Sequence, residues 1–284
     1  MPKKSFLSKL FLPLLTLVGL FFIALLFVPD SWISEEESEW NETQQIQENP
    51  LNEEETQSAV NPDNPIALSY EETSQYQTLK EKYEKIHLLE NIFSSLSEFV
   101  ELPKELTAEY AECGEENAFY DPETQKITLC YEIIEWVESI SSESENPDEV
   151  AQNILTFFSL HEIGHALIDL YELPITGREE DVADQLATFF LLGSNDTSVL
   201  DTADSFYSDL YGLEANELPF ADEHSLDHQR YYNILCWVYG SDTESYKYLV
   251  SEEFIPEERA QICESEYIIF NNSFLTLLEK HIKE

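Results

Sequence analysis

The segment from residue 147 to residue 171 is predicted to be a helix that is apolar on nearly every face. The Asn-Pro-Asp-Glu sequence at 146–149 marks its start, with Asn as N-cap, Pro in the first turn and acidic residues beside the positive helix end. A helix without a polar face must be buried. This one nevertheless carries His161, Glu162 and His165. The fold therefore has to enclose the helix and accommodate three polar side chains.

The sequence His161-Glu162-Ile163-Gly164-His165 is an HExxH motif. Positions i and i+4 of a helix face the same way, so both imidazoles can bind one metal ion. Glu162 is one residue round the helix, within reach of a metal-bound water for which it would act as general base. The alternative is a pair of core histidines, but imidazoles and a carboxylate buried without partners are costly. We predict a zinc ion, with His161 and His165 as ligands and Glu162 as the catalytic base.

A catalytic zinc site with an open position needs a third protein ligand. The extended motif HExxHxxGxxH is absent, because Ile168 and Tyr171 stand at the Gly and His positions. A turn instead reverses the chain into a second predicted helix over 176–192, which begins with a capping box at 176–179. The third ligand is expected on this second helix.

The rise along the two helices decides which carboxylates reach the histidines. At about 1.5 Å per residue, Glu180 arrives near the level of His165, and Asp184 approaches His161. We therefore predict that Glu180 is the third metal ligand and that Asp184 orients a ligating imidazole from behind. The other acidic residues of the same turn are expected to be capping or solvated charges: Glu179 and Asp181.

The remaining sequence predicts a mostly helical α+β domain. A helix is expected to begin at the capping box 69–72, and its apolar stripe runs to Leu102. Two runs of β-forming residues around an Asp-Pro turn predict a β-hairpin over 113–131. A hairpin is only marginally stable alone, so it needs further strands or helix packing. Two more helices are expected over 226–239 and 256–280.

The segment HEIGHALIDLYELPITGREEDVADQLA, residues 161–187, resembles an uncharacterised family of proposed metallopeptidases, a domain of unknown function that is gluzincin-like. Within it, residues 180–184 match the ExxAD or ExxxD segment of gluzincins, the HExxH-plus-Glu peptidases. The resemblance extends over about 75–280. It implies a zincin-like fold, a Zn²⁺ cofactor and hydrolysis of peptide bonds.

Two further sites are implied by this resemblance. Residues 117–120 resemble the substrate-binding edge strand of neprilysin-like enzymes, so Asn117 and Ala118 would bind the substrate backbone by strand addition. An ordinary hairpin strand is the alternative. Gluzincins commonly place a His, Tyr or Arg opposite the zinc to stabilise the oxyanion. His224 fits that role, with Arg230 behind it on the substrate side. A second metal site with His228, or exposed helix histidines, are the alternatives.

The N-terminus is expected to anchor the protein in a membrane. Residues 10–28 are apolar and uncharged, about the length that a helix needs to cross a bilayer, and Lys3, Lys4 and Lys9 precede them. The positive-inside rule then leaves residues 1–9 in the cytoplasm. A cleaved signal peptide is the alternative, but the run ends in bulky residues instead of a small-x-small cleavage site.

The rest of the chain is expected outside the cytoplasm, as an acidic disordered tether over 29–65 and a metallopeptidase domain over 66–284. Four cysteines in such a location indicate two disulfides, for which three connectivities exist. Free thiols and a four-cysteine zinc site are the alternatives, although no CxxC pair is present. Sequence proximity favours two pairs: Cys113–Cys130 and Cys236–Cys263.

The charge of the chain restricts its partners. It has 58 acidic against 14 basic side chains, a net charge of −44. Such a chain would repel phosphate backbones, which excludes a nucleic-acid-binding protein. The prediction is a single-pass, membrane-anchored zinc endopeptidase that acts on a protein or peptide through a metal-activated water. A non-catalytic extracytoplasmic zinc-binding scaffold is the main alternative, and a metal-dependent hydrolase of non-peptide amide bonds is a third.

Overall fold

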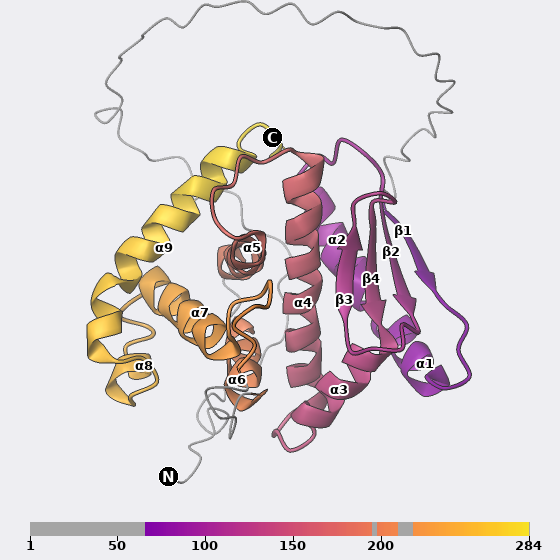
Figure 1. Cartoon of the computed structure of the whole chain (residues 1–284), viewed down its shortest axis with the longest axis horizontal. Helices are drawn as coiled ribbons and strands as arrows, with labels where there is room; N and C mark the ends of the chain where they lie inside the picture. The colour runs from indigo at the N-terminus through magenta and orange to yellow at the C-terminus, as the bar shows by residue number, and fades with distance from the viewer. Residues whose placement is uncertain (1–65, 195–197, 210–217, 284) are drawn as a thin grey trace, which may run out of the picture. The chain divides into compact units, whose positions relative to one another are not determined.

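The computed structural model describes residues 66–194, 198–209 and 218–283 (Figure 1). The predicted cytoplasmic tail, transmembrane helix and acidic tether, residues 1–65, lie outside the described residues. Within those ranges, no helix combines the length and the apolar character needed to cross a membrane. The described residues form a mostly helical α+β fold with one four-stranded sheet, which confirms the predicted fold class at that level.

The sheet has the strand order β1-β2-β4-β3. Strand β2 pairs in parallel with both β1 and β4, whereas β3 and β4 form the antiparallel hairpin that the Asp-Pro turn predicts. The hairpin prediction is therefore confirmed, and β3 is left at the edge of the sheet. The strand bounds are Ile66–Tyr70 (β1), Leu106–Ala111 (β2), Ala118–Asp121 (β3) and Lys126–Cys130 (β4).

The predicted helix start at Ser69 is wrong. Ser69 lies in β1, and its register partner in β2 is Glu109. The helix begins later because the hydroxyl of Thr73 accepts the backbone N–H groups of Gln75 and Tyr76, at 3.1 Å each. The apolar stripe that follows belongs to two helices, α1 (Gln77–Ile86) and α2 (Leu88–Phe99). They are separated at His87, whose φ of 56° is left-handed.

The remaining helices include the four that were predicted. Their predicted ends lie close to the observed ends of α4, α5, α7 and α9, whereas α3, α6 and α8 were not predicted. The capping box predicted at 176–179 does not form, because the N-cap residue of α5 is Arg178 and its side chain makes no capping hydrogen bond. The bounds are Tyr131–Ser141 (α3), Pro147–Leu170 (α4), Glu179–Gly193 (α5), Val199–Asp209 (α6), Asp227–Ser241 (α7), Tyr248–Ser251 (α8) and Glu257–Leu278 (α9).

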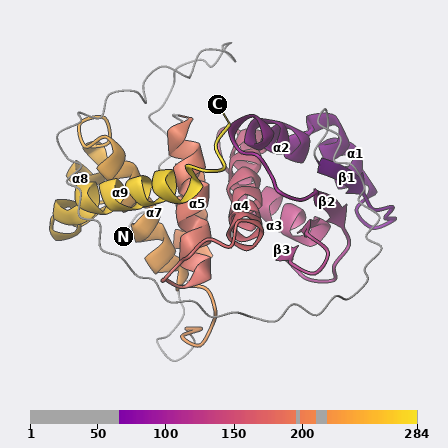
Figure 2. The ribbon, with the colours of Figure 1, turned by 90° about the horizontal axis from the view of Figure 1, so that it is seen from above.

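Helix α4 lies between the sheet and the C-terminal helices. It contacts β3 and β4 together with α2 and α3, and it also packs against α5 and α6 (Figure 1). Helices α7 and α9 contact α5 and each other (Figure 2). Side chains from Val150 to Ile168 along α4 are mostly buried. This double coverage explains why the helix is apolar all round, as its sequence predicts.

Helices α4 and α5 approach each other closely at Gly164. A Cβ atom on Gly164 would lie 3.1 Å from the Cα of Ala183 and 3.3 Å from its Cβ. These distances are shorter than ordinary van der Waals contacts, so a side chain at position 164 would push the helices apart. The glycine inside the HExxH motif therefore lets the first turns of α5 reach the level of the two histidines.

Two disulfides are present, with the predicted connectivity. Cys113, which precedes β3, is bonded to Cys130 at the end of β4. Cys236 of α7 is bonded to Cys263 of α9. The first bond joins the two ends of the hairpin that contains the edge strand. The second joins two of the helices that pack behind α5.

Candidate metal centre

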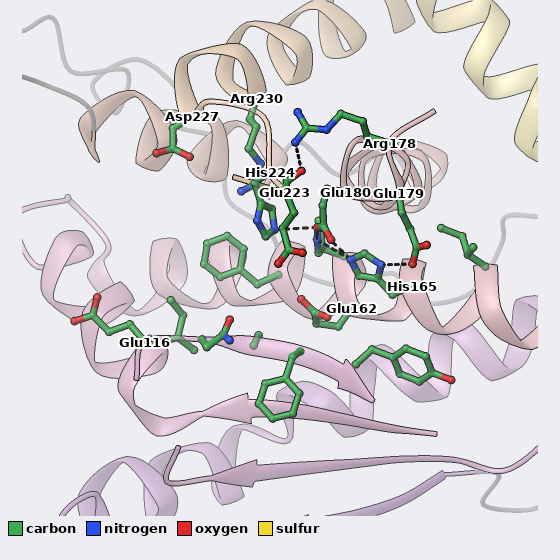
Figure 3. A pocket seen from close by; sticks show the side chains of 18 of the residues that line it. Glu116, Glu162, His165, Arg178, Glu179, Glu180, Glu223, His224, Asp227 and Arg230 are labelled. Carbon is green, nitrogen blue, oxygen red and sulfur yellow. Dashed lines mark hydrogen bonds and ion pairs between the residues drawn. The ribbon is translucent and has the colours of Figure 1, made fainter. Parts of the chain in front are cut away.

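Three donor atoms from α4 and α5 converge at one point (Figure 3). The Oε2 atom of Glu180 lies 3.0 Å from the Nε2 atom of His161 and 3.3 Å from the Nε2 atom of His165. The two Nε2 atoms are 3.2 Å apart. The two histidines share a face of α4, and the α4–α5 turn brings Glu180 to the same level. The structure thus brings together the three residues predicted as ligands.

The spacing of these atoms fits a zinc ion. Tetrahedral ligands at about 2.0–2.1 Å from zinc lie about 3.3 Å from one another. The three observed separations are 3.0, 3.2 and 3.3 Å, so the donors match one face of such a tetrahedron. Two imidazoles and one carboxylate are also a donor set that zinc prefers in catalytic sites, where the fourth position is left for water or substrate.

A second set of donors overlaps the first. The ligand atoms of His161, Glu180 and His224 all lie within 4.8 Å of one another, and the Nε2 atom of His224 is 2.9 Å from the Oε2 atom of Glu180. The two histidines come from different elements. His165 lies on α4, one helical turn after His161. His224 comes from the loop before α7 and its side chain is 39% exposed. Both imidazoles thus lie beside the Glu180 carboxylate, His165 from the HExxH motif and His224 from the loop before α7.

Asp184 contacts the side of His161 that points away from the donor triangle. Its Oδ1 atom is 2.8 Å from the Nδ1 atom of His161. Arg230 donates to the same carboxylate from Nε and Nη2, at 2.8 and 2.7 Å. Burial opposes ionisation of Asp184, but Arg230 and His161 outweigh it and hold its pKa well below the ordinary value. An ionised Asp184 keeps the Nδ1 proton of His161 in place, which leaves Nε2 free to bind metal.

Arg230 is therefore held inside the protein. Only 11% of its side chain is exposed, and its guanidinium lies 4.0 Å above the ring centroid of Phe206. The sequence places Arg230 on the substrate side of the site. In the structure it lines the cleft, but its hydrogen bonds go to Asp184, so its structural role is to hold that carboxylate.

Glu179 does not point away from the site as expected. Its Oε1 atom lies 2.8 Å from the Nδ1 atom of His165, although the carboxylate is 52% exposed. Helical position alone placed Glu179 beyond the site, but its side chain turns back toward the imidazole of His165. Each histidine of the motif thus has its own carboxylate behind it, Asp184 for His161 and Glu179 for His165. Asp181 accepts a hydrogen bond from Ser225 at 2.6 Å, so it is not a purely solvated charge either.

Glu162 is buried at the wall of the cleft, with 8% of its surface exposed. Within the described part of the chain, no hydrogen bond or ion pair engages its carboxylate. Burial raises its pKa above the ordinary value, and the nearby His161 and His165 oppose the shift. A buried carboxylate with a raised pKa, in the same cleft as the donor triangle, has the properties of a general base.

The histidines carry raised pKa values. Burial disfavours the charged form of His161, but its contacts with Asp184 and Glu180 outweigh burial and raise the pKa to about 9. The contact with Glu180 raises the pKa of His224. The pKa of Glu180 is correspondingly low: burial opposes this, but the three imidazoles around it dominate. Without metal, these contacts favour the ionised form of Glu180 and the protonated forms of the imidazoles around it.

The second metal site considered for His224 and His228 does not form among the described residues. The His228 ring lies 5.5 Å from the ring of Tyr207, while His224 points toward Glu180. The backbone N–H of His224 donates to the Oδ1 atom of Asp222 at 2.8 Å. His224 therefore belongs to the first centre.

A cavity of about 1000 Å³ lies in front of the donor atoms. Its floor includes the edge strand β3, with Ala118 and Tyr120 among the lining residues (Figure 3). The N–H of Cys130 donates to the C=O of Asn117 at 3.1 Å, so these two residues form a hydrogen-bonded pair. The following pairs of β3 and β4 then alternate between non-hydrogen-bonded and hydrogen-bonded. Ala118 and Tyr120 therefore occupy non-hydrogen-bonded pairs, and their N–H and C=O groups point outward from the sheet.

Asn117 and Ala118, predicted to bind a substrate backbone, both line this cavity, but in different ways. Ala118 presents backbone groups at the free edge. The backbone oxygen of Asn117 is already used within the hairpin, so Asn117 offers its side-chain amide instead. Tyr120, which the sequence did not single out, presents a second outward pair of backbone groups.

A comparison with protein-family models matches residues 69–278 to one family, DUF4344, whose description is "Putative metallopeptidase". The match covers every described helix and three of the four strands entirely. No curated protein and no solved structure matches the chain.

Proposed function

The chain belongs to the DUF4344 metallopeptidase family, and on this premise we propose that it is a zinc-dependent endopeptidase of the zincin type, similar to gluzincins. One observation carries the proposal. Three donor atoms lie 3.0–3.3 Å apart beside the buried carboxylate of Glu162, in a cleft whose floor is a free strand edge. This arrangement combines a metal site, a base and a place for an extended peptide.

A zinc ion held by His161, His165 and Glu180 would supply Lewis-acid chemistry at the scissile carbonyl and lower the pKa of water. Glu162 takes the proton of the attacking water and delivers it to the leaving amine, which its raised pKa favours. His224 donates a hydrogen bond from Nε2 to the oxygen that becomes negative in the transition state. The contact with Glu180 raises the pKa of His224, which favours this donor form.

The substrate is held by its backbone. An extended peptide that adds to β3 would pair with the outward N–H and C=O groups of Ala118 and Tyr120. The amide of Asn117 would contact the same strand. Backbone pairing does not depend on side chains, so β3 supports binding of many sequences and leaves selectivity to the walls of the cleft.

The test compares the full-length protein with the Glu162→Gln variant on a peptide library. We expect the wild type to bind about one zinc per chain and to cleave. The variant should bind the same amount of zinc and lose cleavage, because it lacks the base but keeps every ligand. Wild-type protein that holds zinc and cleaves nothing would favour the non-catalytic scaffold. Cleavage by Glu162→Gln at the wild-type rate would refute the assigned base.

We also propose that residues 10–28 anchor the protein, with residues 1–9 in the cytoplasm, an acidic tether over 29–65 and the domain 66–284 outside. The lysines before the apolar run support this orientation, as do two disulfides, which persist in oxidising compartments. Protease added to intact cells or spheroplasts should release the domain by cutting in the tether. Protection until the membrane is permeabilised would contradict this topology.

A further inference from the structure

The segment that carries His224 is attached to the start of α5, and Arg178 makes most of the hydrogen bonds. We refer to residues 218–226, between the described part of α6 and the start of α7, as the His224 loop. Arg178, two residues before Glu180, donates from Nη2 to the C=O of Asp222 at 2.7 Å and to the C=O of Glu223. Its Nη1 atom contacts the Ser225 hydroxyl at 3.4 Å. The three acceptors surround His224 in sequence.

A second contact supports the same attachment. The hydroxyl of Ser225 donates to Asp181 at 2.6 Å. Arg178 and Asp181 both belong to the start of α5, so the His224 loop is held at two points by the turn that also supplies Glu180. The loop contributes its own internal support, since Asp222 accepts the backbone N–H of His224 and lies 3.3 Å from its Nδ1 atom.

The simpler explanation, that Arg178 stabilises helix α5, does not fit its contacts. Arg178 occupies the N-cap position, but its side chain makes no capping hydrogen bond. A positive charge at a helix N-terminus is also unfavourable to the helix dipole. Among the described residues, every hydrogen bond found for its guanidinium goes to the His224 loop. The planar guanidinium reaches these acceptors from two nitrogens, Nη1 and Nη2, whereas a lysine would have only one nitrogen to place among them.

We propose that Arg178 is a positioning residue for His224, which holds the loop so that the imidazole Nε2 faces the metal donors. The inference rests on the proposed function, because it assigns to Arg178 the placement of the oxyanion-stabilising side chain. Arg178 itself contacts no donor atom of the metal centre in the structure. It acts through the carbonyls of the two consecutive peptide units that precede His224.

The activity test is a double-mutant cycle in the full-length protein. Arg178→Ala should lower kcat about 10- to 100-fold, with KM and zinc content near wild type. His224→Ala should lower kcat about 100- to 1000-fold. The variant with both changes should be no slower than His224→Ala alone, because Arg178 acts only through His224. Arg178→Lys should restore little of the kcat that Arg178→Ala loses. The control Arg259→Ala, which removes an arginine on α9, should leave kcat unchanged.

Effects that multiply in the double variant would overturn the proposal, because Arg178 would then act on the reaction independently of His224. Loss of zinc from Arg178→Ala would overturn it as well, since the arginine would then be needed to form the metal site.

A measurement without catalysis separates this inference from the proposed function. Backbone amide hydrogen exchange should be about tenfold faster across residues 218–226 in zinc-loaded Arg178→Ala than in wild type. Exchange in α4 and α9 should not change. If the wild type cleaves no peptide, the proposed function fails while exchange still decides the attachment. Equal exchange of the loop in both proteins would overturn the inference whatever the activity.

Discussion

The guanidinium of Arg230 and the carboxylate of Asp184 form a two-point ion pair, at 2.7 and 2.8 Å, behind the imidazole of His161. Both side chains are nearly inaccessible, with 11% and 5% exposed. Asp184 in turn contacts the Nδ1 atom of His161 at 2.8 Å. The orientation of one metal-facing imidazole thus depends on a charge located on α7.

Arg230→Met should reduce stability more than it reduces substrate binding. It leaves the buried Asp184 without its main partner, so we expect a loss of about 3–5 kcal/mol in unfolding free energy. Zinc affinity should fall about 10- to 100-fold, because the support of His161 is weakened. Denaturant unfolding and chelator competition measure the two effects. Arg259→Met, at a more exposed ion pair with Glu266, should cost at most about 1 kcal/mol. If Arg230→Met has normal stability and a raised KM, Arg230 binds substrate, as the sequence predicts, and does not mainly support Asp184.

Glu180 and Glu179 are adjacent but should behave differently. Glu180→Ala removes a donor of the triangle and should lose zinc on dialysis. Glu179→Ala removes the half-exposed partner of His165 and should keep about one zinc per chain, with affinity about 10-fold weaker. Atomic absorption after dialysis measures the metal content of both variants. If Glu179→Ala empties the site and Glu180→Ala does not, the ligand assignment on α5 is wrong.

Gly164→Ala tests whether the spacing of α4 and α5 sets the metal site. The added methyl would lie 3.1 Å from the Cα of Ala183, so α5 must move by a few tenths of an ångström. We expect a loss of about 1–3 kcal/mol in stability and weaker zinc binding. Gly193→Ala is the matched control, because nothing lies within 4 Å of its added carbon. Unchanged zinc affinity in Gly164→Ala would mean that the site tolerates a wider helix spacing.

Zinc affinity should rise with pH up to about 9. The pKa of His161 in the metal-free protein is raised to about 9, and that of His165 is also raised. Zinc binds neutral imidazole, so protons compete with it below those values. The logarithm of the apparent affinity should increase by about 1 to 2 per pH unit between pH 6.5 and 9, then level off. Competition with a chelator of known pH dependence measures it. An affinity that levels off near pH 6.5 would contradict the raised pKa values.

Much of the metal centre follows from local spacing. The positions of His161, His165, Glu180 and Asp184 depend on two helices joined by a short turn, and helical rise alone places their side chains. The contact between Glu179 and His165 was not predicted, because it depends on the side-chain direction in the first turn of α5. The contacts of Arg178 were unpredictable for a different reason, since they require the path of the His224 loop across the site.

The sheet was predicted less completely than the helices. The β3–β4 hairpin is local and has a clear turn sequence. Strand β1 is short and pairs in parallel with residues 106–111, far along the chain. Nothing in its own sequence indicates that partner, and Ser69 within the strand resembles a helix cap. Parallel pairing is non-local, which explains why both β1 and β2 were missed.

The close contact at Gly164 also bears on the order of folding. It belongs to a helical hairpin in which Glu180 lies 19 residues from His161 and Asp184 lies 23 residues from it. These contacts need no residue beyond α5, whereas Arg230 follows Asp184 by 46 residues and is synthesised later. The donor triangle can thus assemble while the ribosome is still adding α7 and α9. Zinc captured at that stage would stabilise the α4–α5 pair and give the later helices a surface on which to pack.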